Sequence, residues 1–285
     1  MLLINVMGIR LSLHPVFVLV MMLSVVTGRF IELLTLFAIV FIHELGHASC
    51  ALLLGIRVTS IQMLPFGGVA TIEDRGDLTA RKEILISLAG PLQNVMMIAA
   101  AYAMNATGMW DGQFLRYFIS SNVIIALFNL LPILPLDGGK IIQALLSIFL
   151  PYHRTLLITY KISIIFSAMM LTYACLPLMR GQEMVDLNAA MMGSFLLYSN
   201  IVDFRNIPYR FVRFLMNRDI LFSAHASSGS LAQPIISMPA KPLDNILRLF
   251  KREKYHMIYV MDKHGNIVGV LPEQRIIKSY FDKRT

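Results

Sequence analysis

Two histidines and a glutamate lie close together in an otherwise apolar stretch, Phe41-Ile-His-Glu-Leu-Gly-His47. On a helix, positions i and i+4 share a face, so His43 and His47 can offer ring nitrogens to one metal ion. Zinc accepts such ligands, and a catalytic zinc keeps three protein ligands and one open position. Glu44 lies beside the histidines, where it can take a proton from a water held by the metal, so the pattern predicts hydrolytic chemistry.

A third ligand must come from elsewhere, and the acidic candidates near the apolar segments are Glu32, Asp137 and a few loop carboxylates. Asp137 ends an irregular stretch that begins at Asn129 and contains Pro132 and Pro135. Irregular backbone at membrane depth survives only when it is buried in protein or lines a wet cavity. A site of two histidines and one carboxylate is therefore the natural completion. The alternatives are a turn-forming Asp before two glycines, and hydrogen bonding between helices for the His-Glu-His cluster.

The composition makes the bilayer the expected solvent. Of 285 residues, 56% are hydrophobic and 15% charged, with a mean hydropathy of +0.66, whereas a soluble domain is about half apolar and about a quarter charged. Two cysteines, Cys50 and Cys175, are too few for a cysteine-based zinc site. A helix needs roughly 20 apolar residues to cross the hydrocarbon layer, so we expect an α-helical polytopic membrane protein. Six spans are predicted, at 11–27, 30–54, 84–104, 114–131, 155–179 and 184–202.

Charge divides the chain into two unlike parts. Residues 203–285 hold 14 Lys and Arg against 7 Asp and Glu, whereas residues 1–202 hold 11 against 10. The short loops on the N-terminal side of the spans carry eight Lys or Arg and the opposite loops three. This bias predicts that both termini are cytoplasmic. The basic tail is expected to face anionic lipid or a soluble partner, with no direct contact to nucleic acid.

Three regions are expected along the chain. Residues 1–202 form the transmembrane domain, and residues 203–230 form a basic interfacial segment that ends in a flexible linker at 223–230. A helical stalk with a solvated basic face is the alternative for that segment. Residues 231–285 form a small α/β cytoplasmic domain. Its expected elements are a helix at 242–252, strands at 257–260 and 267–271, and a closing helix at 272–281.

The His43–His47 motif in a membrane helix, followed by Asn129 to Gly138 in a later one, resembles the site-2 protease family of intramembrane zinc metalloproteases. Leu64-Pro-Phe-Gly-Gly68 and Ala89-Gly-Pro-Leu-Gln-Asn94 between them also look like family segments. Within the family, the whole chain is most similar to the sporulation branch, which processes a membrane-tethered sigma-factor precursor.

The resemblance implies that His43, His47 and Asp137 bind one Zn²⁺ and that Glu44 is the general base and acid. It implies a membrane-tethered precursor protein as substrate, a pro-sigma factor during sporulation, and membrane regulatory or inhibitory proteins as partners. It also implies a multi-pass protein of the bacterial cell membrane, at the membrane around the forespore on the mother-cell side. A polytopic transporter of metal ions or protons is the alternative function, because buried His and Asp also mark ion pathways. A catalytically silent scaffold is a third.

Substrate contacts are implied beside the metal. A helical substrate hides its peptide bonds in hydrogen bonds, so it must be unwound before cleavage. The family implies that Asn129, Pro132 and Pro135 shape the cleft. Asn129 could bond the exposed backbone, and Gly67 and Gly68 could offer a strand edge. The alternatives are an interhelical contact for Asn129 and a simple turn for the two glycines.

The β-α-β-β-α pattern of residues 231–285 is similar to a single CBS motif, a module that usually works in pairs and often binds adenine nucleotides. It implies a homo-oligomer formed through this domain and an adenine nucleotide bound there, with a docking platform as the alternative. The Gly90-Pro91 pair is interpreted as a helix entry or kink. His14 is expected to be a polar residue at the membrane interface, with a gating role as the alternative.

Overall fold

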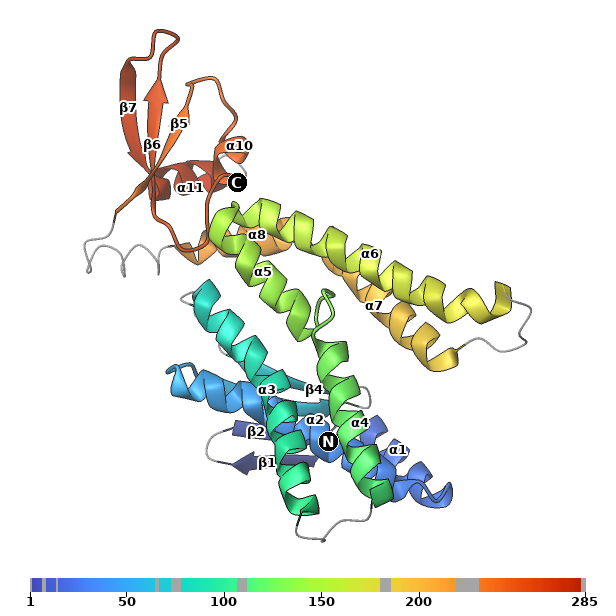
Figure 1. The fold of residues 1–285 in the computed structure, drawn as a ribbon. Helices are drawn as coiled ribbons and strands as arrows, with labels where there is room; N and C mark the ends of the chain where they lie inside the picture. The colour runs from blue at the N-terminus through green and yellow to red at the C-terminus, as the bar shows by residue number, and fades with distance from the viewer. Residues whose placement is uncertain are drawn as a thin grey trace. The chain divides into compact units, whose positions relative to one another are not determined.

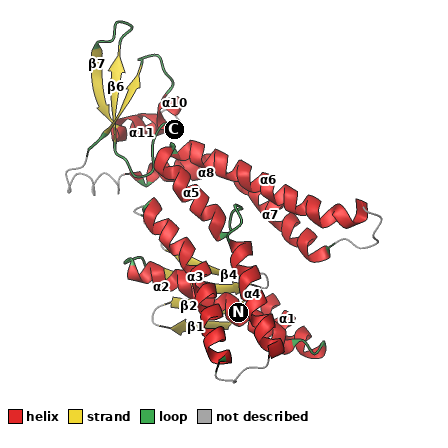
Figure 2. Ribbon diagram, viewed as in Figure 1, coloured by secondary structure: helices red, strands yellow, loops and turns green. Residues whose placement is uncertain are grey.

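The long apolar segments of the sequence form helices, as the ribbons in Figures 1 and 2 show. The computed structural model describes residues 2–6, 9–13, 15–64, 67–72, 78–106, 112–179, 186–218 and 231–282. Five expected spans are helical: α2 (Phe30–Leu53), α3 (Ala80–Asn105), α4 (Gly112–Asn129), α6 (Tyr152–Met179) and α7 (Leu187–Arg205). Among the described helices, three are long and apolar enough to cross a membrane, namely Phe30–Leu53, Ala80–Asn105 and Tyr152–Pro177.

The segment expected to span at 11–27 has a different structure. Its first residues belong to strand β2 (Ile9–Leu13), and helix α1 (Pro15–Val26) has 12 residues. A helix of that length rises about 18 Å, well short of a hydrocarbon layer of about 30 Å. Apolar and polar residues alternate from Ile9 to Leu13, which is the period of a strand. The prediction of one continuous helix is therefore wrong here.

A four-stranded sheet has the strand order β1-β2-β3-β4, from β1 (Leu2–Val6) to β3 (Val58–Leu64) and β4 (Gly67–Ile72). Strand β2 pairs antiparallel with β1 and parallel with β3, and β4 returns antiparallel beside β3. Gly67 lies opposite Leu64, and Gly68 lies opposite Met63. The two glycines therefore lie in an edge strand and not in a turn.

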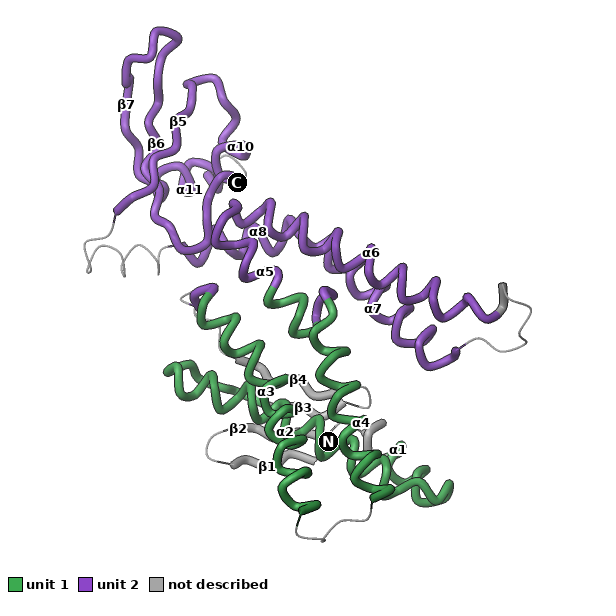
Figure 3. Tube along the Cα trace, viewed as in Figure 1, with its two compact units in different colours: residues 1–74, 81–131, 136–141 green, residues 75–80, 132–135, 142–285 purple. Residues whose placement is uncertain are grey.

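The chain divides into two compact units (Figure 3). The first comprises Met1–Asp74, Arg81–Leu131 and Leu136–Ile141; the second comprises Arg75–Ala80, Pro132–Pro135 and Ile142–Thr285. In the irregular stretch before helix α5 (Asp137–Phe149), Ile133 and Leu134 are buried, whereas Leu130 and Pro135 are exposed. Within the second unit, Leu134 donates its N–H to Ser163 Oγ (2.9 Å), and its carbonyl accepts from Asn200 Nδ2 (2.6 Å). The Leu134–Pro135 peptide bond is cis.

The second unit also contains the paired helices α6 and α7, helix α8 (Ile207–Met216) and a small α/β domain. In its three-stranded sheet, β5 pairs parallel with β6 and β6 antiparallel with β7. The expected order of strands and helices is observed, with a shorter first helix. The elements are β5 (Gln233–Ser237), α10 (Leu243–Leu247), β6 (His256–Met261), β7 (Ile267–Pro272) and α11 (Glu273–Asp282).

Helix α8 packs into this domain, which neither expectation for residues 203–230 anticipated. Phe211 and Leu215 join the buried core with Ile235 and Ile258. The next charged residue, Arg218, is 2% exposed, and its guanidinium donates two hydrogen bonds to Glu273 (2.8 and 2.6 Å). The apolar face of the segment and its last arginine thus pack against the domain. The expected contact of its other face with headgroups stays a prediction. The linker at 223–230 lies outside the described residues.

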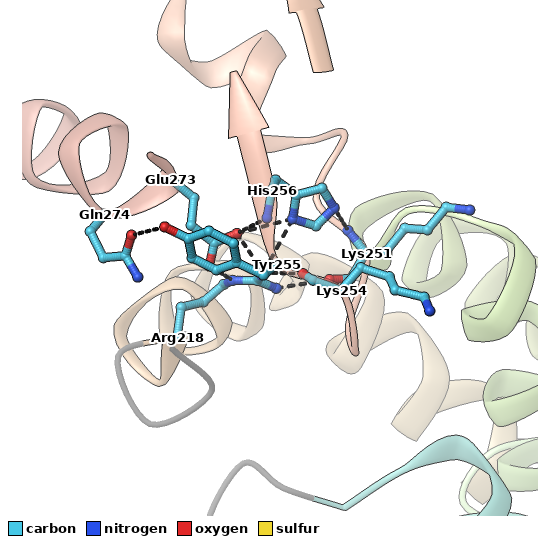
Figure 4. Close-up of polar contacts among 7 residues, drawn as sticks. All are labelled: Arg218, Lys251, Lys254, Tyr255, His256, Glu273 and Gln274. Atoms are coloured by element: carbon cyan, nitrogen blue, oxygen red, sulfur yellow. Dashed lines mark hydrogen bonds and ion pairs between the residues drawn. The ribbon is translucent and has the colours of Figure 1, made fainter. Parts of the chain in front are cut away.

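Figure 4 shows the polar network around Arg218. Arg218 also donates to the carbonyl oxygens of Lys251 and Lys254. His256 Nε2 accepts the Lys251 N–H (3.2 Å), so the ring proton is on Nδ1 and is donated to Glu273 Oε2 (3.0 Å). This pattern requires a neutral His256, since a second ring proton would face the Lys251 N–H.

Acidification is expected to destabilise this domain. Burial lowers the pKa of His256 below its usual value, and Arg218 lowers that pKa further, although the hydrogen bond to Glu273 opposes both. Burial raises the pKa of Glu273, but hydrogen bonds from His256 and Arg218 outweigh it and lower that pKa overall. Below about pH 6.5 the unfolded chain therefore binds more protons than the folded one, so stability falls as pH drops, and Glu273 adds to the loss at lower pH.

Calorimetry of the full chain in detergent should show the domain's Tm falling between pH 7 and pH 5, by roughly 4–8 °C for each kcal/mol lost. His256→Asn should flatten this dependence, because it removes the titrating ring. His264 lies in the exposed turn before β7, so His264→Gln is the matched control and should leave the dependence unchanged. An equal slope in all three proteins would show that His256 is not its source.

Candidate metal centre

Helix α2 presents His43 and His47 on its buried face, as the i, i+4 spacing predicts. The two side chains belong to residues 2% and 6% exposed, and their Nε2 atoms lie 3.2 Å apart. Asp137 is the first residue of α5 and is 3% exposed. Its Oδ2 lies 3.1 Å from His43 Nε2 and 3.0 Å from His47 Nε2. The three side chains predicted as metal ligands thus meet, although His43 and Asp137 are 94 positions apart in the chain.

Helix α3 fixes the other nitrogen of each ring. His43 Nδ1 lies 2.6 Å from Asn94 Oδ1, and His47 Nδ1 lies 2.7 Å from the Ile86 carbonyl oxygen. Both partners are acceptors, so each Nδ1 carries the ring proton and each Nε2 keeps its lone pair. Partners of this kind orient metal-binding histidines in known sites. No sequence pattern predicts a role for either partner, although Asn94 ends one of the motif segments.

The donor set fits zinc. Two Nε2 lone pairs and a carboxylate oxygen converge at 3.0 to 3.2 Å with no proton between the nitrogens, an arrangement that is repulsive unless a cation lies among them. Zinc bonds to N and O ligands are about 2.0–2.2 Å long, which in a tetrahedral site puts ligand atoms roughly 3.3–3.5 Å apart. The observed spacing agrees with this to within a few tenths of an ångström.

Gly90 leaves the space in which these groups meet. A Cβ built on it would lie 2.6 Å from His43 Nε2 and 2.5 Å from His47 Cε1, and closer still to His47 Nε2. Such separations are far below carbon contact distances of about 3.5–4.0 Å. Helix α3 runs unbroken past Gly90 and Pro91, so the interpretation of this pair as a helix entry is wrong. Gly90 lies beside the metal centre because only a residue without a side chain lets α3 approach the two rings.

Asp137 is oriented by a neighbour on its own helix. Lys140 Nζ donates to Asp137 Oδ1 at 3.1 Å, which leaves Oδ2 for the two histidines. The first turn of α5 also lies tightly against the end of α4. A Cβ on Gly138 would overlap the Leu130 and Leu131 carbonyl groups. Any residue larger than glycine at position 138 would therefore push the start of α5 away from α4, and the carboxylate of Asp137 would move with it.

Glu44 is half-buried next to the histidines. Its carboxylate lies within 4.8 Å of a ring nitrogen from each, and these three residues form a group that could hold a metal ion. Asp137 Oδ2 already lies 3.0 to 3.1 Å from the two Nε2 atoms, so Glu44 is a second carboxylate beside the same cluster. That geometry suits a proton acceptor beside the metal better than a ligand of it.

The predicted substrate-binding residues do not all have the expected surroundings. Asn129 is half-buried, and its Nδ2 donates to the Ile125 carbonyl (3.0 Å) one turn back in the same helix, so that bond is not an interhelical contact. Pro132 is half-buried and Pro135 exposed, both in the irregular stretch after α4. The described residues do not include His14 or residues 65–66, which follow β3 in the sequence.

The chain is similar to known metalloproteases over nearly its whole length. The profile of Peptidase family M50 matches residues 31–110 and 105–171, which include all four residues of the centre. Stage IV sporulation protein FB of Bacillus subtilis is 30% identical over 97% of this chain and 93% of that protein. A zinc metalloprotease of Methanocaldococcus jannaschii is 25% identical over 98% of this chain and 81% of its own length.

A solved structure gives the same result. The site-2 protease from Methanocaldococcus jannaschii aligns with a TM-score of 0.56 and 25% identity, over 71% of this chain and 94% of that one. Similarity to the sporulation protein extends across nearly the whole of both chains. The chain therefore belongs to peptidase family M50 and is a site-2 type membrane metalloendopeptidase.

Proposed function

We propose that the protein hydrolyses a peptide bond in or near the membrane segment of a membrane-tethered precursor, with His43, His47 and Asp137 as zinc ligands. The observation that supports this most is the convergence of two Nε2 atoms and Oδ2 at 3.0 to 3.2 Å in a buried place next to Glu44. A transporter would need no proton acceptor at that position.

Hydrolysis adds a water oxygen to the carbonyl carbon, breaks the C–N bond and moves a water proton to the leaving nitrogen. In our proposal Glu44 accepts that proton as general base and returns it to the nitrogen as general acid. Zinc, when bound, supplies a Lewis acid that lowers the pKa of water and polarises the carbonyl. Asn94 and the Ile86 carbonyl hold the histidine rings, and Lys140 holds Asp137, throughout the reaction.

An unwound substrate segment is proposed to pair with strand β4. Gly67 and Gly68 lie in this edge strand, whose outer backbone groups face no further strand among the described residues. Addition of an extended peptide to such an edge supplies hydrogen bonds for the exposed substrate backbone. Asn129, Pro132 and Pro135 are proposed to shape the cleft beside the scissile segment, as the family resemblance implies.

The substrate and setting follow from the similarity to the sporulation protein. We propose a pro-sigma factor as substrate, both termini in the cytoplasm, and a site in the membrane around the forespore on the mother-cell side. The CBS-like domain is proposed to mediate homo-oligomer formation and to bind an adenine nucleotide. Membrane regulatory or inhibitory proteins are the further expected partners. The β-α-β-β-α order observed in residues 231–282 supports the CBS-like assignment.

Co-expression with candidate membrane-tethered precursors tests the function directly. We expect a soluble fragment whose new terminus, determined by mass spectrometry, lies in or next to the substrate's membrane segment. The same substrate without the protease supplies the background. A fragment that ends far from the membrane segment, or appears equally in both samples, would contradict the proposal.

Asp137→Ala should sharply reduce the zinc content of the purified protein, because it leaves two ligands of three. Asp186 is the exposed N-cap of α7, where it accepts from the Ala189 N–H (3.2 Å), so Asp186→Ala is a matched control that should keep its zinc. Metal analysis of both proteins in detergent gives the comparison. Normal zinc in Asp137→Ala would remove Asp137 from the ligand set.

A further inference from the structure

A chain of two buried amides reaches from helix α4 to His43. Asn122 on α4 and Asn94 on α3 are both 0% exposed. Asn122 Oδ1 lies 3.1 Å from Asn94 Nδ2, and Asn94 Oδ1 lies 2.6 Å from His43 Nδ1. Asn94 belongs to one of the motif segments, whereas no sequence pattern singles out Asn122.

The direction of this chain is fixed at its far end. Asn122 Nδ2 donates to the Phe118 carbonyl oxygen at 2.9 Å, and a backbone carbonyl can only accept. Asn122 must therefore turn its oxygen toward Asn94, and Asn94 must offer its NH₂ in return. That leaves Asn94 Oδ1 facing His43, where it accepts the Nδ1 proton.

The opposite orientation of Asn94 would change the ring. An amide is nearly symmetric in shape, so packing alone discriminates poorly between its oxygen and its nitrogen. With its NH₂ toward His43, Asn94 would favour the tautomer that carries the proton on Nε2, the atom that faces Asp137 Oδ2 and His47 Nε2. That tautomer cannot bind a metal through Nε2. His47 avoids the problem, because a backbone carbonyl, that of Ile86, accepts its Nδ1 proton directly.

We propose that Asn122 is a positioning residue of the metal centre: it sets the orientation of the Asn94 amide and, through it, the tautomer of His43. This inference rests on the proposed ligand role of His43. The competing explanation is that the two amides only join helices α3 and α4, as polar side chains do in membrane proteins.

These two explanations predict different zinc affinities, which are measured on the full chain in detergent by competition with a chelator. Asn122→Leu removes the acceptor with a side chain of the same branching and should weaken zinc binding by about 10-fold or more, as lost partners of metal ligands do. Asn122→Asp keeps an oxygen toward Asn94 whether the new carboxyl is protonated or ionised, so its affinity should stay close to that of the unaltered protein. If the amides only join helices, the apolar Leu is tolerated at least as well as Asp.

A double substitution adds a second criterion. Asn94→Leu should weaken zinc binding by itself, and adding Asn122→Leu should change little further, because the effect passes through Asn94. The visible spectrum of bound Co²⁺ should shift in Asn122→Leu and not in Asn122→Asp. Ser167 is a buried hydroxyl on α6 that donates to the Ser163 carbonyl within its own helix, so Ser167→Ala is the control and should leave affinity and spectrum unchanged.

Unchanged affinity in Asn122→Leu, or equal losses in Asn122→Leu and Asn122→Asp, would overturn the inference. If Asn122→Leu is not recovered folded, Asn122→Ala also deprives Asn94 of its acceptor and takes its place with the same outcomes. Zinc binding by the unaltered protein and its loss in Asp137→Ala test the ligand assignment separately, so failure of the proposed centre is distinguishable from failure of the role of Asn122.

Discussion

Glu44→Gln is expected to lower the rate of substrate cleavage by about 10²–10⁴-fold, the contribution typical of a positioned general base and acid. Gln has nearly the shape of Glu but cannot accept the water proton. Because His43, His47 and Asp137 supply the converging ligand atoms without Glu44, the variant should keep its zinc. The expected result is thus a folded, metal-containing and inactive enzyme, shown by cleavage assays and metal analysis on the same preparation.

Glu32 gives the matched control, since it lies exposed in the first turn of the same helix. Glu32→Gln removes the same charge from α2 and should cleave at the normal rate. Retained cleavage by Glu44→Gln would eliminate the proposed mechanism. Loss of zinc in that variant would instead make Glu44 a ligand.

Gly90→Ala should weaken zinc binding at least as much as the roughly 10–100-fold typical of lost partners around a metal ligand, and activity should fall with it. The added methyl group would overlap both imidazole rings. The rings cannot simply move aside, because their Nδ1 partners, Asn94 and the Ile86 carbonyl, lie on the same helix as Gly90. A ring that swings away from the new methyl group loses its hydrogen bond as well as its place in the ligand set.

Helix propensity alone predicts that Gly90→Ala stabilises the protein, so a loss of zinc binding in this variant cannot be explained by a weaker helix. Ala is favoured over Gly in a helix interior by roughly 0.5–1 kcal/mol, so α3 alone would gain stability. Gly112 begins α4, and the nearest atom to a Cβ built there is Arg116 Nη1 at 4.0 Å. Gly112→Ala should therefore keep normal zinc affinity, measured by chelator competition. Normal affinity in Gly90→Ala would mean that α3 does not lie against the histidines as described.

The C-terminal region shows which structural features a local sequence pattern predicts and which it does not. Two short apolar runs on either side of a polar turn predicted the strands at 257–260 and 267–271, and both are present within a residue or so of the expected bounds. The same approach predicted a membrane-surface role for the segment that ends at Arg218. An arginine among aromatics is equally compatible with headgroups and with a buried carboxylate, and only the position of Glu273, 55 residues later, shows that Arg218 itself has a carboxylate partner.

The sequence by itself determined the chemistry of this protein. Helical periodicity is local, so the spacing of His43 and His47 was enough to put two imidazoles on one face, and their apolar surroundings made a functional role the expected one. Asp137 followed as the expected third ligand from the scarcity of acidic groups and from family resemblance. The tertiary structure decided which atoms meet: Oδ2 of Asp137, the Asn94 and Asn122 amides, and the gap at Gly90. Those contacts depend on how helices distant in the chain pack together, and no local pattern of residues specifies that packing.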